Sequence, residues 1–269
     1  MELTGFDIRA FLAEDVGDGD LTSASVVPAD AMLSASLVLK ERGVVCGLGV
    51  AEAVFRELDP DVRFEALVDD GDDVAGEVAR IEGNARALLT GERTALNLLG
   101  RLSGIATLTR RYVEAVAGTR ATILDTRKTT PGLRALEKLA VRCGGGANHR
   151  FGLYDAILIK DNHLRLAGGV AAAVRAASGQ GVPVEVECEM LADVREALDA
   201  GADILLLDNM SLSDMREAVL LVGGRARIEA SGGVSLDTVQ AVARTGVDTI
   251  SVGALTHSAR SLDVSMEVR

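Results

Sequence analysis

The sequence predicts an α/β protein with a mixed N-terminal part and a C-terminal part built from repeated strand–helix units. Nearly half of the 269 residues (48%) are apolar, which is ample for a sizeable core. After residue 120, six short apolar runs alternate with helix-like segments, and the last four runs end at intervals of 21, 23 and 22 residues: Glu187, Asp208, Ser231 and Gly253. A steady β–α period of this length is typical of parallel strands joined by crossover helices.

The N-terminal part, up to about residue 104, mixes helical and strand patterns and is expected to form an α+β layer. Helical spacing predicts a short helix over 6–15 and another over 47–58, while alternating or continuous apolar runs predict strands over 31–41 and 62–68. The stretch 72–83, "DDVAGEVARIEG", resembles a further pair of strands. A long helical pattern then runs from Asn84 to Ala117, with an expected interruption at Gly100 or Gly104.

The C-terminal part is predicted to be a small or incomplete α/β barrel. Its expected strands are the runs 121–126, 156–160, 184–187, 204–208, 227–231 and 249–253, and its expected helices are 132–145, 166–179, 191–201, 212–224 and 235–246. Six units are fewer than the eight of a complete barrel, and an open doubly wound sheet is the alternative. The barrel is preferred because each run ends in a polar residue or glycine, and a barrel gathers the carboxyl ends of its strands on one face.

Charge and cysteine content exclude several classes of protein. A net charge of −12 argues against general nucleic-acid binding, which needs a basic surface. The cysteines Cys46, Cys143 and Cys188 form no CxxC pair, so neither a disulfide framework nor a zinc site is expected, and Cys143 and Cys188 are predicted to be small core residues. No signal-like segment or apolar run of about 18 residues is present. We therefore expect a cytoplasmic protein that does not bind membranes.

The window 125–165 holds eight bases against four acids, although the whole chain is acidic. Within it, the i, i+4, i+8 spacing of Arg134, Lys138 and Arg142 predicts one solvated helix face. The remaining basic side chains lie at strand ends or in loops: Arg127, Lys128, His149, Arg150 and Lys160. Any one of them alone would be an ordinary surface charge. Their convergence at one barrel mouth predicts a pocket for a strongly anionic ligand.

Acidic and glycine-rich strand ends add two further expectations. Glu187 and Asp208 each close a strand, and they are predicted to hold Mg²⁺ together with substrate phosphates and water, the alternative being simple polar caps. The stretches "ASGGV" (230–234) and "VGAL" (252–255) close the last two strands, where small residues let backbone N–H groups approach a phosphate and a following helix adds its positive end.

Longer stretches of the chain resemble the quinolinate phosphoribosyltransferase (decarboxylating) family, also called nicotinate-nucleotide pyrophosphorylase, of NAD biosynthesis. They are "EDVGDGDLTS", "GERTALNLLGRLSGIAT", "DTRKTTPGLRALEKLAVRCGGGANHRFGLYDAILIKDNH", "EVECE", "LLLDNMS", "EASGGV" and "VGALTHS". A related molybdenum-linked family shares "TRKTTPG" but usually departs from "LYDAILIKDNH", which makes it the alternative.

The resemblance implies a reaction and an architecture. Quinolinate and phosphoribosyl pyrophosphate would give nicotinate mononucleotide, pyrophosphate and CO₂, so the chain would be a pentosyltransferase. An N-terminal α/β sandwich over 1–104, with the tail 258–269 packed back on it, would precede an incomplete barrel over 105–257. The family's obligate homodimer is implied as well, with any higher oligomer left open.

The resemblance also implies roles for single residues. Substrate-binding positions are Arg93 (from the partner subunit), Thr126, Arg127, Lys128, His149, Arg150, Lys160, Glu187, Asp208, Ser231, Gly232, Gly233, Gly253 and Ala254. Catalytic roles fall to Lys128, Lys160, Glu187 and Asp208, without a choice between the lysines for the decarboxylation step. Mg²⁺ would lie at Glu187 and Asp208. Of Glu185, Glu187 and Glu189, the strand end favours Glu187. A non-catalytic anion-binding barrel is the competing hypothesis.

Overall fold

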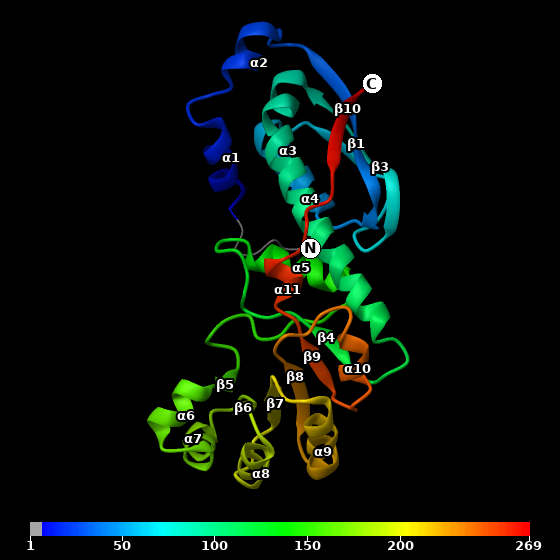
Figure 1. Ribbon diagram of the computed structural model, residues 1–269. Helices are drawn as coiled ribbons and strands as arrows, with labels where there is room; N and C mark the ends of the chain where they lie inside the picture. The colour runs from blue at the N-terminus through cyan, green and yellow to red at the C-terminus, as the bar shows by residue number, and fades with distance from the viewer. Residues whose placement is uncertain (1–6) are drawn as a thin grey trace. The chain divides into compact units, whose positions relative to one another are not determined.

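The computed structural model describes residues 7–269, which divide into two compact units (Figure 1). The first unit contains residues 7–110 together with Thr130–Gly145 and Ser258–Arg269, and the second contains Arg111–Thr129 and Gly146–His257. The expected first helix began at Phe6, which lies outside the described residues; the observed helix is α1 (Ile8–Val16). The domain limits 1–104 and 105–257 stay a prediction.

The first unit is built around a four-stranded antiparallel sheet in the order β10–β1–β3–β2. Its strands are β1 (Met32–Val44), β2 (Arg63–Ala66), β3 (Asp73–Asn84) and β10 (Val264–Val268), and its helices are α1, α2 (Leu21–Val26), α3 (Leu48–Leu58), most of α4 (Ala85–Ala115) and α5 (Arg134–Cys143). The expected strand pair over 72–83 is wrong. The segment is one long strand, because register shifts in β1 allow continuous pairing from Met32–Asn84 to Val44–Asp73.

Helix α4 is continuous, so the expected interruption at Gly100 or Gly104 is also wrong. The two glycines instead allow a close approach of the C-terminal segment. A Cβ atom on Gly100 would lie 2.6 Å from the carbonyl oxygen of Leu262, and one on Gly104 would lie 2.0 Å from that of Arg260. Both glycines are therefore explained by packing rather than by a break in the helix.

Helix α5 does not carry the solvated basic face that the sequence predicted. Lys138 is 1% exposed and Glu137 is fully buried. The guanidinium group of Arg101, on α4, lies 2.8 Å from the Glu137 carboxylate, which also accepts from the backbone N–H of Thr130. The helix is thus packed on two sides, and charge periodicity alone could not distinguish paired internal charges from solvated ones.

The second unit is a six-stranded parallel sheet in the order β4–β9–β8–β7–β6–β5, which confirms the predicted α/β class with six parallel strands. The strands are β4 (Thr122–Leu124), β5 (Ile157–Ile159), β6 (Val184–Cys188), β7 (Ile204–Asp208), β8 (Arg227–Ser231) and β9 (Thr249–Ser251). The first strand pairs with the last, and the others follow in sequence, as in a barrel. Among the described residues no pairing joins β4 to β5, so the barrel stays open there.

Short helices follow the strands of this unit: α6 (Asp161–Ala167), α7 (Val170–Ala177), α8 (Leu191–Asp199), α9 (Leu212–Val222), α10 (Val239–Ala243) and α11 (Ala254–His257). The single helix expected over 166–179 is divided, because Gly168 and Gly169 both adopt positive φ angles. No helix in the described part of the chain is long and apolar enough to cross a bilayer.

Candidate active site

A cavity of about 860 Å³ opens at the carboxyl ends of the parallel strands. Thirteen of the fourteen sequence-predicted binding residues line it: Thr126, Arg127, Lys128, His149, Arg150, Lys160, Glu187, Asp208, Ser231, Gly232, Gly233, Gly253 and Ala254. Arg93 does not; it lies on an exposed part of α4. Residues spread over 129 positions of sequence therefore meet in one place, because the carboxyl ends of the parallel strands lie on the same side of the barrel.

The basic loop after β4 is held by buried polar contacts. Asp125 is fully buried, and its carboxylate accepts from the side-chain amide of Asn148 (2.6 Å) and the backbone N–H of His149 (2.9 Å). The backbone N–H of Lys128 donates to the Thr126 hydroxyl, and the Thr256 hydroxyl donates to the Lys128 carbonyl (2.7 Å). These contacts fix the backbone from which Arg127 and Lys128 extend, so the two cations are positioned before any ligand binds.

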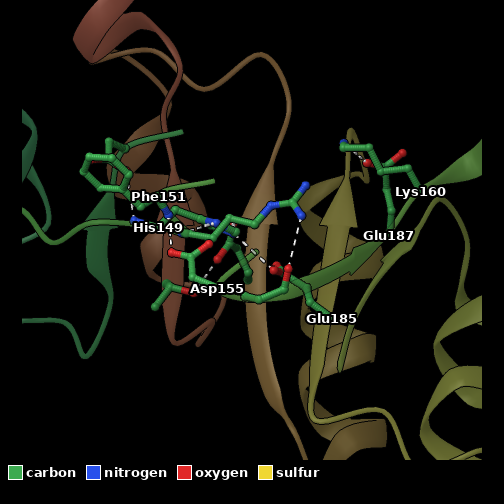
Figure 2. Close-up of polar contacts among 11 residues, drawn as sticks. His149, Phe151, Asp155, Lys160, Glu185 and Glu187 are labelled. Carbon is green, nitrogen blue, oxygen red and sulfur yellow. Dashed lines mark hydrogen bonds and ion pairs between the residues drawn. The ribbon is translucent and has the colours of Figure 1, made fainter. Parts of the chain in front are cut away.

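His149 contacts two buried carboxylates inside the barrel. Its Nε2 atom lies 3.1 Å from Glu185 and 3.4 Å from Glu229, which are 3% exposed each. Figure 2 shows the His149–Glu185 contact apart from a second pair, Lys160 and Glu187. A further cavity of about 530 Å³ extends toward the amino ends of the strands and shares His149, Arg150 and Glu229 with the first. The histidine therefore lies between the substrate-sized cavity and an acidic interior.

Opposing effects act on the protonation of His149. Burial lowers its pKa, and the backbone N–H of Arg150 donates to Nδ1, which favours the neutral ring. The carboxylates of Glu185 and Glu229 outweigh the effect of burial and raise the pKa of His149 to about 10, because charges interact strongly where water is excluded. Burial in turn raises the pKa of Glu185. Burial, together with the neighbouring Arg127 charge, lowers the pKa of Arg150.

Glu187, one residue before the end of β6, and Asp208, the last residue of β7, have distinct partners. The Lys160 ammonium lies 2.5 Å from Oε2 of Glu187, while the side-chain amide of Asn209 donates to Oδ2 of Asp208 (2.9 Å). The hydrogen bonds of the described residues thus engage one oxygen of each carboxylate. Two hard oxygen donors at one cavity wall fit Mg²⁺, which usually takes one or two carboxylates and completes its shell with water and substrate phosphates.

The glycine loop after β8 is shaped by close packing. Gly232 has φ +92°, and a Cβ atom there would lie 2.3 Å from Oδ1 of Asn209. Asn209 itself has a positive φ of 54°, and its backbone N–H donates to the Ser231 carbonyl. The helix predicted over 235–246 is shorter in the structure, where α10 begins at Val239 and has five residues. The backbone N–H groups of the loop itself are therefore the nearest groups suited to a phosphate.

Sequence reasoning missed several residues that line the cavity, chiefly Asn209, Glu229 and His257. Asn209 directly follows a strand-ending aspartate, and asparagine tolerates the left-handed conformation found there, so its position held a usable signal. Glu229 lies two residues before Ser231 on the same strand. Because side chains alternate between the two faces of a strand, Glu229 is expected on the same face as Ser231, directed into the barrel. His257 offered no comparable signal.

Family models and relatives of known sequence identify the family of this chain. A model described as quinolinate phosphoribosyl transferase, N-terminal domain, matches residues 20–103, and one for the C-terminal domain matches residues 105–267. A probable nicotinate-nucleotide pyrophosphorylase [carboxylating] of Bacillus subtilis is 48% identical, with 97% of this chain and 92% of the relative covered. A quinolinate phosphoribosyltransferase [decarboxylating] of Nicotiana tabacum is 41% identical, with 97% and 81% covered.

Solved structures agree over the whole chain. The crystal structure of NadC from Streptococcus pyogenes superposes with a TM-score of 0.93 at 46% identity, covering 97% of this chain and 94% of that one. The nicotinate-nucleotide pyrophosphorylase from Francisella tularensis gives the same TM-score and coverage at 41% identity. These relatives favour the quinolinate phosphoribosyltransferase family over the molybdenum-linked alternative. With both family models matched and the basic cavity in place, the chain belongs to the quinolinate phosphoribosyltransferase family.

Proposed function

We propose that this chain transfers the phosphoribosyl group of phosphoribosyl pyrophosphate to the ring nitrogen of quinolinate and removes one carboxylate. The products are nicotinate mononucleotide, pyrophosphate and CO₂, in the biosynthesis of NAD. One observation carries the proposal: four Arg and Lys side chains, two histidines, three carboxylates and two glycine loops line a single cavity in a chain of this family.

The cavity's charges suit the two substrates. Quinolinate carries two carboxylates, and the sugar donor carries a phosphate and a pyrophosphate, so binding both brings many negative charges together. Arg127, Lys128, Arg150 and Lys160 offset that repulsion, and Arg is suited to bidentate carboxylate contacts. The raised pKa of His149 adds a further positive charge at neutral pH. The backbone N–H groups near Gly232, Gly233 and Gly253 suit the phosphate of the donor.

The chemistry requires electrostatic stabilisation more than proton transfer. The pyridine nitrogen already has a lone pair, so no general base is needed for its attack on the ribose carbon. As pyrophosphate leaves, that carbon gains positive character, which Glu187 and Asp208 stabilise from the cavity wall. The new bond makes a pyridinium cation, whose positive nitrogen stabilises the carbanion left when the adjacent carboxylate departs as CO₂. A proton then replaces the carboxylate on the ring carbon.

Glu187 and Asp208 are the residues that would hold Mg²⁺. Bound there, the ion would neutralise charge on the leaving pyrophosphate. Lys160 already balances Glu187, so the pair keeps a local charge near zero while a dication and polyphosphate enter. The two lysines therefore occupy different positions in the cavity. Lys160 pairs with the Glu187 carboxylate, and Lys128 extends from the loop after β4, whose backbone is held by Thr256.

A homodimer completes the proposed site. Arg93 is exposed on α4 and absent from the cavity wall, which supports its use by a partner subunit, as the family resemblance implies.

A cytoplasmic location remains a prediction, supported by three free cysteines.

The test incubates the protein with quinolinate, phosphoribosyl pyrophosphate and Mg²⁺ and measures nicotinate mononucleotide by chromatography. Two variants are compared with the unmodified protein: Arg127→Gln and a matched control, Arg165→Gln. Arg165 is exposed on α6 and does not line the cavity. We expect Arg127→Gln to raise KM for quinolinate at least about tenfold, since a lost charged hydrogen bond costs roughly 1.5–3 kcal/mol, and Arg165→Gln to match the unmodified protein. Binding of both substrates without product would instead support the anion-binding hypothesis.

A further inference from the structure

Two cysteines that the sequence separates by 97 positions meet in the first unit. The Sγ atoms of Cys46 and Cys143 lie 3.2 Å apart. Cys46 follows β1 and is fully buried, whereas Cys143 ends α5 and is partly exposed. Cys143 was predicted to be a small core residue, but it is only partly buried and contacts a second thiol. Sequence could not reveal the contact, because the two residues share no motif.

Helix α4 holds the backbone on both sides of this pair. The backbone N–H of Cys46 donates to the Ser103 hydroxyl (3.0 Å), and that hydroxyl donates back to the Cys46 carbonyl. The Arg110 guanidinium donates to the carbonyl oxygens of Gly144 and Cys143. A Cβ atom on Gly144 would lie 2.5 Å from the carbonyl of Ala106, so the end of α5 packs tightly on α4. The sulfur atoms are thus held close by rigid backbone rather than by chance rotamers.

The two thiols differ in ionisation. The hydrogen bond that Cys143 receives from Cys46 lowers the pKa of Cys143, and the Arg142 charge acts in the same direction, while burial and the Asp70 charge oppose the shift. Donation of that hydrogen bond, together with burial, raises the pKa of Cys46. Cys143 is thus the more readily ionised and the more exposed of the two thiols, which makes it the one that an oxidant attacks first, and Cys46 is the adjacent thiol that can resolve it.

Asp70 lies beside both cysteines, so a metal site is the competing reading. Two features disfavour it. Oδ1 of Asp70 already accepts the backbone N–H groups of Gly47 (2.9 Å) and Leu48 (3.1 Å) where α3 begins. Two thiolates on a tetrahedral zinc ion, each about 2.3 Å from the metal, stand roughly 3.8 Å apart, wider than the 3.2 Å observed.

We propose that Cys46 and Cys143 form a reversible disulfide when the protein meets a peroxide. The Cys143 thiolate attacks one oxygen of H₂O₂ and becomes a sulfenic acid, releasing hydroxide. The Cys46 thiol then attacks the sulfenic sulfur; the S–S bond forms, and the sulfenic oxygen leaves with the thiol proton as water. Two thiols are oxidised, one peroxide is reduced, and a dithiol reverses the reaction by exchange.

The modified segment is the one that carries α5, which lies in sequence between the cavity residues Lys128 and His149. The disulfide ties the end of this segment to the chain between β1 and α3. The proposal concerns this covalent link and does not depend on the proposed reaction.

Treatment of the reduced full-length protein with H₂O₂, followed by intact-mass measurement and peptide mapping, tests the proposal. We expect the mass to fall by about 2 Da, a 46–143 linked peptide, and return of both thiols with dithiothreitol. Cys188 is the internal control, because burial raises its pKa to about 12 and it should stay reduced. In Cys46→Ser, sulfenic acid should accumulate on Cys143 and react with dimedone; in Cys188→Ser, the disulfide should still form.

Three outcomes would overturn the proposal. The first is a treated protein in which Cys46 and Cys143 keep both thiols while Cys188 reacts. The second is overoxidation of Cys143 without any linked peptide. The third is stoichiometric Zn²⁺ binding that Cys143→Ser abolishes and that blocks the peroxide reaction, which would assign the cluster to a metal. The wild-type mass and peptide map decide the matter even if Cys46→Ser does not fold.

Discussion

At the scale of single residues, the site depends on carboxylates that hold cations in place. Asp125 is buried and binds the chain at Asn148 and His149, Glu187 pairs with Lys160, and the Glu185–Glu229 pair faces His149. Buried acids thus lie directly against two of the cavity bases, Lys160 and His149. Such buried pairs are sensitive to loss of one member, since the other is left uncompensated.

The raised pKa of His149 predicts how stability changes with pH. Its folded pKa, about 10, lies above the ordinary value of 6.5, so the protonated ring stabilises the fold fully below pH 6.5 and the contribution is lost as pH rises toward 10. We expect the free energy of unfolding to fall by about 1 kcal/mol per pH unit in this range, and less steeply in His149→Gln. Urea denaturation at pH 6.5, 8 and 9.5 measures both; equal slopes would contradict the assignment.

Residue-scale geometry also explains what sequence could and could not predict at the site. Strand ends followed from apolar runs, so Asp208 and Ser231 were found without a structure. The choice among Glu185, Glu187 and Glu189 was harder, because all three fall on one face of a period-two strand. The three residues differ in their position along the strand. Glu187 lines the cavity at the carboxyl ends of the strands, and Glu185 lines the second cavity, toward the amino ends. Glu189 lies beyond the end of the strand and is exposed. That depth depends on register, which a single sequence does not specify.

At the scale of elements, glycine was the residue most often misread. Gly100 and Gly104 predicted a break in α4, whereas they serve contact with the chain near Leu262 and Arg260. A sequence pattern cannot distinguish these roles, because the contacting residues lie more than 150 positions away. The same holds for the buried Lys138 on α5, whose helical spacing matched a solvated face.

The packing of α4 gives a direct test. Gly104→Ala would place a methyl group 2.0 Å from the Arg260 carbonyl oxygen, so either α4 or the C-terminal segment must shift. We expect a loss of roughly 2–3 kcal/mol in the free energy of unfolding. Gly49→Ala in α3 is the matched control, because a Cβ atom there meets nothing within 4 Å, and it should be neutral or stabilising by about 0.5–1 kcal/mol. A fully stable Gly104→Ala in urea denaturation would disprove the packing explanation.

At the scale of the whole molecule, the chain combines an antiparallel sheet unit with an open barrel of six strands. The parallel order from β5 to β9 agrees with the regular period of the sequence, because each of these strands pairs with the one before it, whereas β4 pairs with β9. The assignment of α5 to the first unit was not, since its sequence position lies between two barrel strands. Long-range packing of this kind leaves no local pattern.

The shared-site proposal makes a prediction for the assembled molecule. Arg93→Ala should lower kcat/KM at least about a hundredfold while the dimer persists in sedimentation, because the side chain would contact the partner's substrate and not the subunit interface core. Mixing Arg93→Ala with a cavity variant such as Glu187→Gln should restore part of the activity, since mixed dimers contain one intact site. Full activity of Arg93→Ala alone would show that each chain completes its own site.

The central claim is that one cavity couples phosphoribosyl transfer to decarboxylation of quinolinate. The most direct measurement supplies quinolinate labelled in the 2-carboxylate, together with phosphoribosyl pyrophosphate and Mg²⁺, and quantifies labelled CO₂, nicotinate mononucleotide and pyrophosphate in the same samples, with nicotinate as the control acceptor. The account predicts equal amounts of the three products from quinolinate and none from nicotinate. Nucleotide formed without CO₂, or formed equally well from nicotinate, would contradict it.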